Sequence, residues 1–346
     1  MQEKGLGVGI VGTGFMGSTH ANAWAKVPYT RYIAICETSP RMYERAEELA
    51  FRLNAKLYKS YEELLKDPNI NAVDICLPTF LHRDYAVKAM EAGKHVLLEK
   101  PIALRLKDAR EIIDTAKKTG VKFMVAHVLR FFPEYVRIKY LVDVGAIGEP
   151  RIARAYRYSS FPAWSVKGWY GEHKLSGGVV VDMAIHDYDF LRWVFNDDVD
   201  RVCALAPPPE KKVIKEITAI DHGMIILKFK KGGIAFVMTS WSYPKGYPFS
   251  TYFEIAGTNG ILHVDNKITA PLRIAKPDLY EGRQVFWQDP YYLEILHFAE
   301  HIVEGKPLRV TPEDAYKALE IALAVLKSAL EGGVPVNLPL KEEVIP

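Results

Sequence analysis

The sequence has few cysteines, no long apolar run and no large excess of charge. Three cysteines occur in 346 residues, Cys36, Cys76 and Cys203, and their spacing forms neither a disulfide framework nor a zinc motif. No uninterrupted apolar stretch approaches the roughly 20 residues that span a bilayer. The N-terminus lacks the apolar core of a signal peptide. We therefore expect a soluble, cytoplasmic protein without a metal site.

Charges of the two signs are nearly balanced along the chain. There are 45 Lys and Arg residues against 42 Asp and Glu residues, which gives a formal net charge of +3. This balance argues against a nucleic-acid surface and against a basic membrane anchor. Because 49% of the residues are hydrophobic, a chain of this length is sufficient for two domains, each with its own core.

Short apolar runs alternate with helical periodicity in the first third of the chain. Helices are expected at residues 15–26, 41–53, 81–91 and 106–118, and the apolar runs between them predict buried strands. Continuous apolar strands that alternate with helices are typical of a parallel sheet covered on both faces. The sequence thus predicts an α/β fold whose residues 1–127 form a Rossmann dinucleotide-binding domain.

After about residue 127 the pattern changes to longer strands joined by hairpin turns. Turns are expected at Gly232-Gly233 and at Asn259-Gly260. Helices are expected at 134–144, 180–195, 291–304 and 312–331. We predict that residues 128–346 form an α+β domain with a large, open, mainly antiparallel sheet and helices on one face.

A glycine motif follows the first predicted strand. Gly12, Gly14 and Gly17 have the G-x-G-x-x-G spacing between a strand and a helix, which is the context that this motif requires. The first glycine permits a tight turn, the second lets a pyrophosphate approach the backbone, and the third lets helix and strand pack closely. The turn, with Phe15 and Met16 in it, predicts a dinucleotide site.

Glu37 ends the second predicted strand, 20 residues after Gly17. A carboxylate at this position accepts hydrogen bonds from ribose hydroxyls and repels a 2′-phosphate, so it favours NAD over NADP. Arg41, one helical turn further on, would attract a phosphate. NADP therefore stays an alternative cofactor.

Glu99 and Lys100 stand at the end of the fourth long apolar run, "HVLLE". In open α/β sheets, ligands bind beyond the carboxyl ends of the strands. A lysine there would lie close to the nicotinamide and its substrate. Its charge would stabilise an alkoxide as it develops.

A polar stripe interrupts the apolar helix expected at 180–195. Asp182, His186 and Asp189 recur at steps of four and seven residues, so they predict one face of a helix. Burying such a stripe is costly unless it faces a partner or a cavity. Histidine suits a general base near neutral pH, so His186 would accept a hydroxyl proton and Asp182 would orient its ring or bind substrate. A purely structural histidine is the alternative.

Four motifs, "GIVGTGFMGSTHA", "LPTFLH", "EKPIAL" and "SGGVVVDMAIHDYDFLRW", occur in an order and spacing that resemble the Gfo/Idh/MocA oxidoreductase family. The resemblance covers nearly the whole chain. It implies that Lys100 is the catalytic lysine, Asp182 the orienting aspartate and His186 the general base. Further positions match the family's cofactor and substrate segments: Pro78, Thr79 and His82 on the cofactor side, Asp189 and Arg130 on the substrate side.

Two features suggest a substrate pocket that differs from those of relatives. His127 stands where many relatives have Asn or Gln, so it either belongs to that pocket or caps the fifth strand. Trp169 lies in an aromatic segment that would suit stacking on a sugar face, although core packing explains aromatic residues equally well.

The resemblance implies an NAD-dependent dehydrogenase that transfers a hydride between nicotinamide and a secondary hydroxyl group of a sugar, polyol or cyclitol. It also implies a homodimer or homotetramer formed through the C-terminal sheet. Two alternatives stay open. One is an NAD-dependent glycoside hydrolase or lyase that acts through transient oxidation at C3, and the other is a non-catalytic nucleotide sensor.

Overall fold

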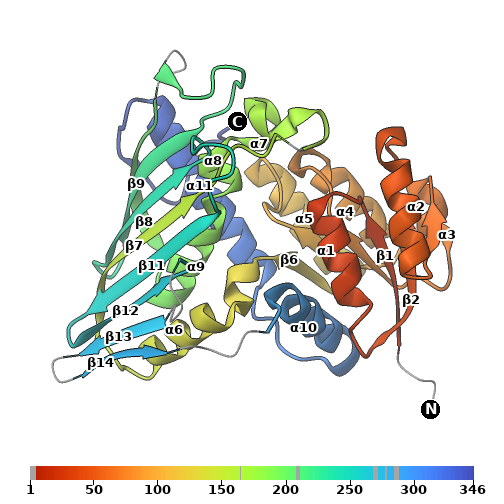
Figure 1. Cartoon of the computed structure of the whole chain (residues 1–346), viewed down its shortest axis with the longest axis horizontal. Helices are drawn as coiled ribbons and strands as arrows, with labels where there is room; N and C mark the ends of the chain where they lie inside the picture. The colour runs from red at the N-terminus through yellow and green to blue at the C-terminus, as the bar shows by residue number, and fades with distance from the viewer. Residues whose placement is uncertain (1–4, 164, 208–210, 268–271, 277–278, 284–287) are drawn as a thin grey trace. The chain divides into compact units, whose positions relative to one another are not determined.

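The computed structural model describes residues 5–163, 165–207, 211–267, 272–276, 279–283 and 288–346 (Figure 1). The chain divides into two compact units. Unit 1 comprises Met1–Ala103, Lys107–Phe131 and Gln288–Tyr316, and unit 2 comprises Leu104–Leu106, Phe132–Trp287 and Lys317–Pro346. The main division thus lies close to the predicted boundary at residues 127 and 128. The segment Gln288–Tyr316 differs from the prediction, because it packs with the first unit.

Unit 1 contains the predicted parallel sheet, with six strands in the order β3-β2-β1-β4-β5-β6. The strands are β1 (Leu6–Val11), β2 (Thr30–Cys36), β3 (Lys56–Tyr58), β4 (Ala72–Ile75), β5 (His95–Glu99) and β6 (Phe123–Ala126). Every neighbouring pair is parallel. The strand order reverses between β1 and β4, and ligands of such sheets bind at the carboxyl ends of the strands at this switch point.

The helices expected in the first third of the chain are present. They are α1 (Phe15–Trp24), η1 (Pro40–Met42) with α2 (Tyr43–Arg52), α4 (His82–Glu91) and α5 (Leu106–Thr119). Three further short elements belong to this unit: α3 (Tyr61–Lys66), η2 (Thr79–Leu81) and η3 (Val128–Phe131). Ser60 caps α3 by accepting a hydrogen bond from the Glu63 amide, as S/T-x-x-E sequences do.

Helix α10 (Pro290–Glu304) explains why a late segment of the chain joins unit 1. It packs against α1 and η3. Ile295, Phe298 and Ala299 are fully buried in one apolar cluster with Trp24 and Phe131. Because α10 places its apolar stripe on these residues, it completes the core of the dinucleotide-binding unit.

Unit 2 contains a sheet of nine strands in the order β14-β13-β12-β11-β7-β10-β9-β8-β15. These strands are β7 (Pro150–Tyr158), β8 (Val199–Leu205), β9 (His222–Phe229), β10 (Ile234–Ser240), β11 (Ser250–Gly257), β12 (Gly260–Asp265), β13 (Leu272–Lys276), β14 (Leu279–Arg283) and β15 (Val336–Asn337). β7 pairs parallel with β10, and the other pairs are antiparallel. The predicted mainly antiparallel sheet is confirmed.

Both predicted hairpins form. Residues 230–233 connect β9 to β10, and the Gly232 amide donates to the Phe229 carbonyl, so the first turn begins before the predicted glycine pair. Gly257 pairs with Gly260 across the second hairpin, so the turn residues are Thr258 and Asn259. The second turn thus begins one residue earlier than the sequence indicates.

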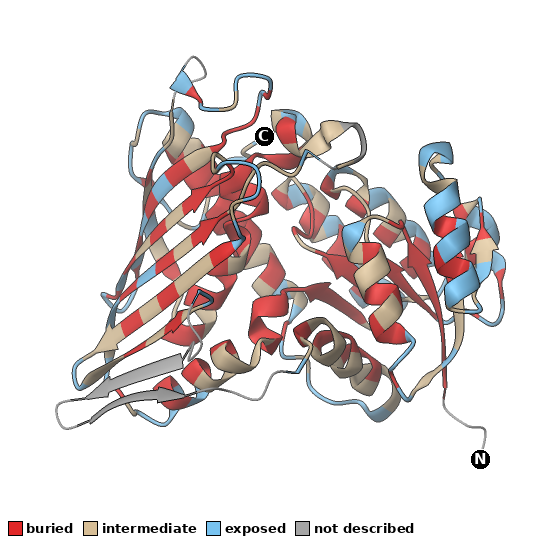
Figure 2. Cartoon of the chain, viewed as in Figure 1, coloured by how far each residue is buried: buried red, intermediate tan, exposed pale blue. Residues whose placement is uncertain are grey.

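The helices of unit 2 are α6 (Pro133–Asp143), α7 (His173–Ser176), α8 (Val179–Asp182), α9 (Ile185–Phe195) and most of α11 (Pro312–Leu330). Contacts of α6, α8 and α9 with β7, β9, β10 and β12 place these helices on the sheet. Burial alternates along the strands, as the bands in Figure 2 show. Phe190 of α9 packs edge-on against Tyr135 of α6 and Phe253 of β11, with ring centroids 4.8 Å apart in both pairs.

Within the described residues, no helix combines the length and the apolar character that a membrane crossing requires.

The position of α10 leads to a prediction about stability. Replacing the fully buried Phe298 by Ala should lower the free energy of unfolding by about 3–5 kcal/mol, because the lost apolar contacts leave a cavity in the core of unit 1. Phe51 is 91% exposed and provides the control, since its replacement by Ala should change stability by only about 0.5 kcal/mol. Urea unfolding checks both variants. Equal effects would show that α10 contributes little to this core.

Candidate active site

The three glycines of the turn after β1 differ in what an added Cβ atom would meet. Gly12 has a φ of +92°, and a Cβ there would lie 2.7 Å from the carbonyl oxygen of Cys76. A Cβ at Gly17 would lie 1.9 Å from the carbonyl oxygen of Gly12, so only glycine lets α1 approach the turn. At Gly14, nothing lies within 4 Å of the Cβ position.

Gly14 is therefore the open side of the turn. It is the N-cap residue of α1, and no side chain caps the helix there. An uncapped helix N-terminus attracts anions through its amide groups and its dipole. Phe15 (56% exposed) and the half-buried Met16 begin the helix beside it. The residues present thus fit the pyrophosphate of a dinucleotide.

Glu37 lies beside this turn. Its Oε2 accepts hydrogen bonds from the backbone amide and the hydroxyl of Thr13, at 3.0 and 2.7 Å, and its Oε1 accepts one from the Ser39 amide at 2.9 Å. The carboxylate is buried, with 5% exposure, and it connects the end of β2 to the glycine turn. Arg41 lies on η1 and is exposed.

The segment that follows β4 also begins at the carboxyl edge of the sheet. Pro78 begins η2, and Thr79 in it is buried. His82 is fully buried, with Nδ1 2.7 Å from the carbonyl oxygen of Pro101 and Nε2 2.8 Å from that of Leu77. Its burial lowers the pKa of His82. The ring thus joins the segment after β4 to the segment that carries Lys100.

Lys100 follows β5, and its peptide bond to Pro101 is cis. The backbone amide of Lys100 donates a hydrogen bond to Glu99 Oε2 at 2.9 Å. Burial alone would raise the pKa of Glu99, but the contact and charge of His20, together with Lys100, hold it below its usual value. Glu99 is therefore a carboxylate that fixes the backbone at Lys100.

His20 and Asp74 are site-supporting residues that the sequence analysis missed. Both side chains are fully buried, and His20 Nδ1 lies 2.9 Å from Asp74 Oδ2. Cys76 Sγ lies 3.4 Å from Asp74 Oδ1, and the ligand-type atoms of the three residues lie within 4.8 Å of one another. A signal was present, because an aspartate inside the apolar run "AVDICL" and a histidine in the first helix are both costly to bury alone.

In unit 2, the expected single helix at 180–195 is two helices. Asp182 ends α8, whereas His186 and Asp189 lie in α9. The Ala184 amide donates to the carbonyl of Val179, five residues back, which interrupts the regular α-helical pattern. Asp182 and Asp189 are buried, at 6% and 1% exposure, and His186 is half-buried.

The start of α8 depends on a close backbone approach. Gly178 has a φ of +75°, and a Cβ there would lie 2.7 Å from the carbonyl oxygen of Ile220. The Val179 amide donates to that same carbonyl at 3.0 Å. This explains the glycine pair that precedes the helix in the sequence.

Asp187 anchors α9 to the sheet. Its two carboxylate oxygens accept hydrogen bonds from Nε and Nη2 of Arg157 in β7, each at 2.9 Å. Each residue is 3% exposed, so this is a buried bidentate pair. The sequence analysis did not assign a role to Asp187, although it directly follows His186.

Three further residues, two in unit 1 and one in unit 2, were predicted to bind substrate. His127 is buried after β6, and Arg130 is buried in η3 of unit 1. Arg130 Nη1 donates to the carbonyl of Arg309 at 2.8 Å and to Asp314 Oδ2 at 3.2 Å. Trp169 of unit 2 lies in η4 (Val166–Gly171), with its ring stacked on Tyr170 at 3.9 Å. Their roles toward substrate stay predictions.

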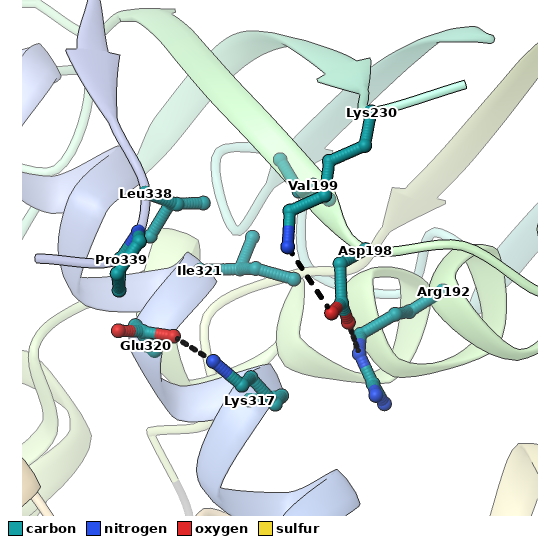
Figure 3. Close-up of a pocket in the computed structure, with 9 residues that line it drawn as sticks. All are labelled: Arg192, Asp198, Val199, Lys230, Lys317, Glu320, Ile321, Leu338 and Pro339. Carbon is teal, nitrogen blue, oxygen red and sulfur yellow. Dashed lines mark hydrogen bonds and ion pairs between the residues drawn. The ribbon is translucent and has the colours of Figure 1, made fainter. Parts of the chain in front are cut away.

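A cavity in unit 2 is too small for a sugar or a cyclitol (Figure 3). It has a volume of about 20 Å³, which is room for one water molecule. The charged side chains in it are paired: Arg192 with Asp198 at 2.8 Å and Lys317 with Glu320 at 2.9 Å. We assign this cavity no ligand.

The open glycine turn, the carboxylate that follows β2 and the strand order of the sheet define a dinucleotide-binding Rossmann unit. The comparisons agree with this class. The family model "Oxidoreductase family, NAD-binding Rossmann fold" matches residues 6–127, and the model of the GFO/IDH/MocA C-terminal domain matches residues 135–263. The chain belongs to the Gfo/Idh/MocA oxidoreductase family.

Several relatives are similar over almost their whole length. The scyllo-inositol 2-dehydrogenase (NAD(+)) of Bacillus subtilis strain 168 is 30% identical, with 96% of each chain covered. The myo-inositol 2-dehydrogenase of Thermotoga maritima is 30% identical, with 98% of this chain and 99% of the relative covered. A structure of levoglucosan dehydrogenase in complex with NADH and levoglucosan is 26% identical, covers 97% of this chain and 100% of its own, and gives a TM-score of 0.85.

The three glycines give a prediction about cofactor binding. Gly14→Ala should weaken NADH binding about tenfold while the protein stays folded, because the added methyl group meets only the incoming phosphates. Gly17→Ala should instead destabilise the fold, since its methyl group would meet the Gly12 carbonyl. NADH fluorescence titration and urea unfolding separate the two effects. Unchanged NADH affinity in Gly14→Ala would contradict the assignment of the pyrophosphate to this turn.

Proposed function

We propose that the protein is an NAD-preferring dehydrogenase that transfers a hydride between nicotinamide and a secondary hydroxyl group, or the corresponding ketone, of a sugar, polyol or cyclitol. The observation that carries this proposal is Lys100, held at the carboxyl end of β5 by Glu99 in the dinucleotide-binding unit. Relatives about 30% identical that are named inositol 2-dehydrogenases support the substrate class.

The proposed roles follow from the chemistry of an alcohol oxidation. Bound NAD supplies the hydride acceptor. His186 takes the hydroxyl proton as general base, because an imidazole accepts a proton near neutral pH. The Lys100 ammonium group stabilises the negative charge that develops on the substrate oxygen. Asp182 orients the His186 ring or binds a substrate hydroxyl.

Substrate binding is proposed for four further residues. Asp189 would accept hydrogen bonds from substrate hydroxyls. His127 and Arg130 would contribute from the segment after β6, and the Trp169 ring would stack on the apolar face of a sugar or cyclitol. The cofactor would also contact Pro78, Thr79 and His82.

The preference for NAD rests on Glu37. Three donors hold its carboxylate beside the glycine turn, where it offers acceptor oxygens to a ribose and repels a 2′-phosphate. Arg41 is one helical turn away and exposed, so its charge is screened by solvent and weakens the preference only partly.

We also propose that the protein forms a homodimer or homotetramer through its C-terminal sheet. Ile152, Met224, Ile226 and Ile234 are between 48% and 57% exposed on the central strands β7, β9 and β10. Ile234 pairs with Ile152, and Phe236 pairs with Ile226, so these side chains form one continuous apolar surface, the open sheet face. Apolar surfaces of this kind mark association sites.

The first test is turnover. Purified protein with NAD or NADP and a panel of myo-inositol, scyllo-inositol, glucose, galactose and xylose should produce NADH with one or more compounds, at an NAD rate at least about tenfold above the NADP rate. His186→Asn should lower kcat about 10²- to 10⁴-fold, because the general base is lost, while NADH affinity stays unchanged. His301→Ala, on α10 of unit 1, is the matched control.

Each alternative gives a different result in the same assay. Release of an aglycone without net NADH would identify the hydrolase or lyase. Tight cofactor binding with no turnover of any sugar or glycoside would favour the sensor. Full activity in His186→Asn would exclude His186 as the base.

The oligomer has its own test. Ile226→Lys places a charge in the open sheet face and should reduce the molar mass measured by light scattering after size exclusion. Leu330→Lys, a 59% exposed position near the end of α11, should not change the mass. A wild-type protein that is monomeric at micromolar concentration would contradict the proposed interface.

A further inference from the structure

His20 lies between two carboxylates in the core of unit 1. Its side chain is fully buried on α1. Nδ1 lies 2.9 Å from Asp74 Oδ2, and Nε2 makes an ion-pair contact with Glu99 Oε1 at 3.3 Å. Asp74 belongs to β4 and Glu99 ends the neighbouring strand β5. The imidazole therefore joins α1 to both strands.

This arrangement determines the protonation of the ring. A neutral imidazole has one N–H donor and one lone pair, whereas a carboxylate only accepts. A lone pair facing either carboxylate would be repelled, so the ring satisfies both neighbours only as an imidazolium. Burial acts against the charge, but Asp74 and, to a smaller extent, Cys76 outweigh it and hold the pKa of His20 well above its usual value.

The other groups around the ring do not cancel this charge. Trp24 Nε1 donates to Asp74 Oδ2 at 2.7 Å, and the Tyr291 ring of α10 lies 6.3 Å from the His20 ring. Burial raises the pKa of the Cys76 thiol, which therefore stays neutral beside Asp74. The ring thus faces two carboxylates, and Lys100 acts together with it to lower the pKa of Glu99.

The same three residues offer ligand-type atoms within 4.8 Å of one another, which raises the possibility of a metal. A thiolate is required for Cys76 to act as a strong ligand, and burial disfavours the thiolate. His20 Nδ1 and the Asp74 oxygens are also occupied by their mutual contact and by Trp24. A proton on the ring, rather than a metal ion, fits these contacts.

Glu99 transmits the position of His20 to Lys100. One carboxylate oxygen contacts His20, and the other accepts the Lys100 amide at 2.9 Å. On the far side of Lys100, the Pro101 carbonyl lies 2.7 Å from His82. The backbone of Lys100 is therefore fixed from both sides, and His20 supplies the charge that keeps Glu99 in place.

We propose that His20 is a positioning residue: as an imidazolium between Asp74 and Glu99, it fixes the Glu99 carboxylate and thereby the backbone of Lys100. The proposal rests on the proposed function for the catalytic role of Lys100. The protonation of His20 and the order of the Lys100 backbone do not depend on that role, and both are measurable without turnover.

The first experiment measures the ring directly in the full-length protein with ¹⁵N-labelled histidine. The His20 signals, identified by their loss in His20→Gln, should show a proton on both ring nitrogens at pH 8, where a solvated histidine is neutral. The Lys100 amide signal should shift or broaden in His20→Gln. Tyr58→Phe is the matched control, because it removes a buried hydrogen bond at 2.6 Å to Asp67 in the same unit and should leave the Lys100 signal unchanged.

The second experiment measures kcat against pH. Without the imidazolium, buried Glu99 loses the contact and the charge of His20 and keeps the weaker influence of Lys100, so its pKa rises and it becomes protonated as the pH falls. The ratio of wild-type kcat to His20→Gln kcat should then be about tenfold at pH 9 and increase further toward pH 6. For Tyr58→Phe the ratio should stay constant with pH.

Three results would overturn the proposal. These are a His20 ring with one proton at pH 7, stoichiometric zinc in the purified protein, and a Lys100 amide signal that is the same in His20→Gln and in the wild type. A different outcome is a wild type that shows no turnover but has a doubly protonated His20, while the Lys100 amide signal shifts in His20→Gln. That outcome would refute the proposed function and support the positioning contact.

Discussion

The contact between the start of α1 and the carbonyl of Gly12 is the constraint on which unit 1 depends. A Cβ at Gly17 would lie 1.9 Å from that oxygen, so only glycine lets the helix begin there. The helix then leaves its N-terminus open at Gly14 and, six residues later, brings His20 against β4 and β5. One steric requirement thus fixes both the open N-terminus of α1 and the position of His20 behind the proposed catalytic lysine.

Both units use a buried ion pair next to a proposed catalytic residue. Glu99 contacts His20 and precedes Lys100, whereas Asp187 is held by Arg157 and follows His186. A buried pair contributes little net stability, because desolvation offsets its attraction, but breaking it leaves an unpaired charge at a cost of about 3–5 kcal/mol. Such pairs therefore specify position more than they stabilise the fold.

Most of the fold could be predicted because its signals are local. The glycine spacing, the apolar strands and the hairpin turns depend on residues close in sequence, and each agrees with the structure. The exceptions depend on distant contacts. The break between α8 and α9 follows a helix start held by Ile220, and α10 joins unit 1 because its apolar stripe meets Trp24. In the candidate site, His20 was missed because its partners, Asp74 and Glu99, lie in two strands that are distant from α1 in the sequence.

The proposed catalytic residues and the proposed substrate-binding residue Trp169 lie in different kinds of structure. Lys100 follows a strand and His186 lies in a helix, so backbone hydrogen bonds of regular elements hold both positions. Trp169 and Tyr170 instead stack in the short 3₁₀ segment η4, where the Tyr170 carbonyl accepts a hydrogen bond from Ser176. Irregular segments change more readily than the elements that carry them. Relatives 26–30% identical to this chain bear names for inositols and for levoglucosan, so one fold accommodates more than one substrate.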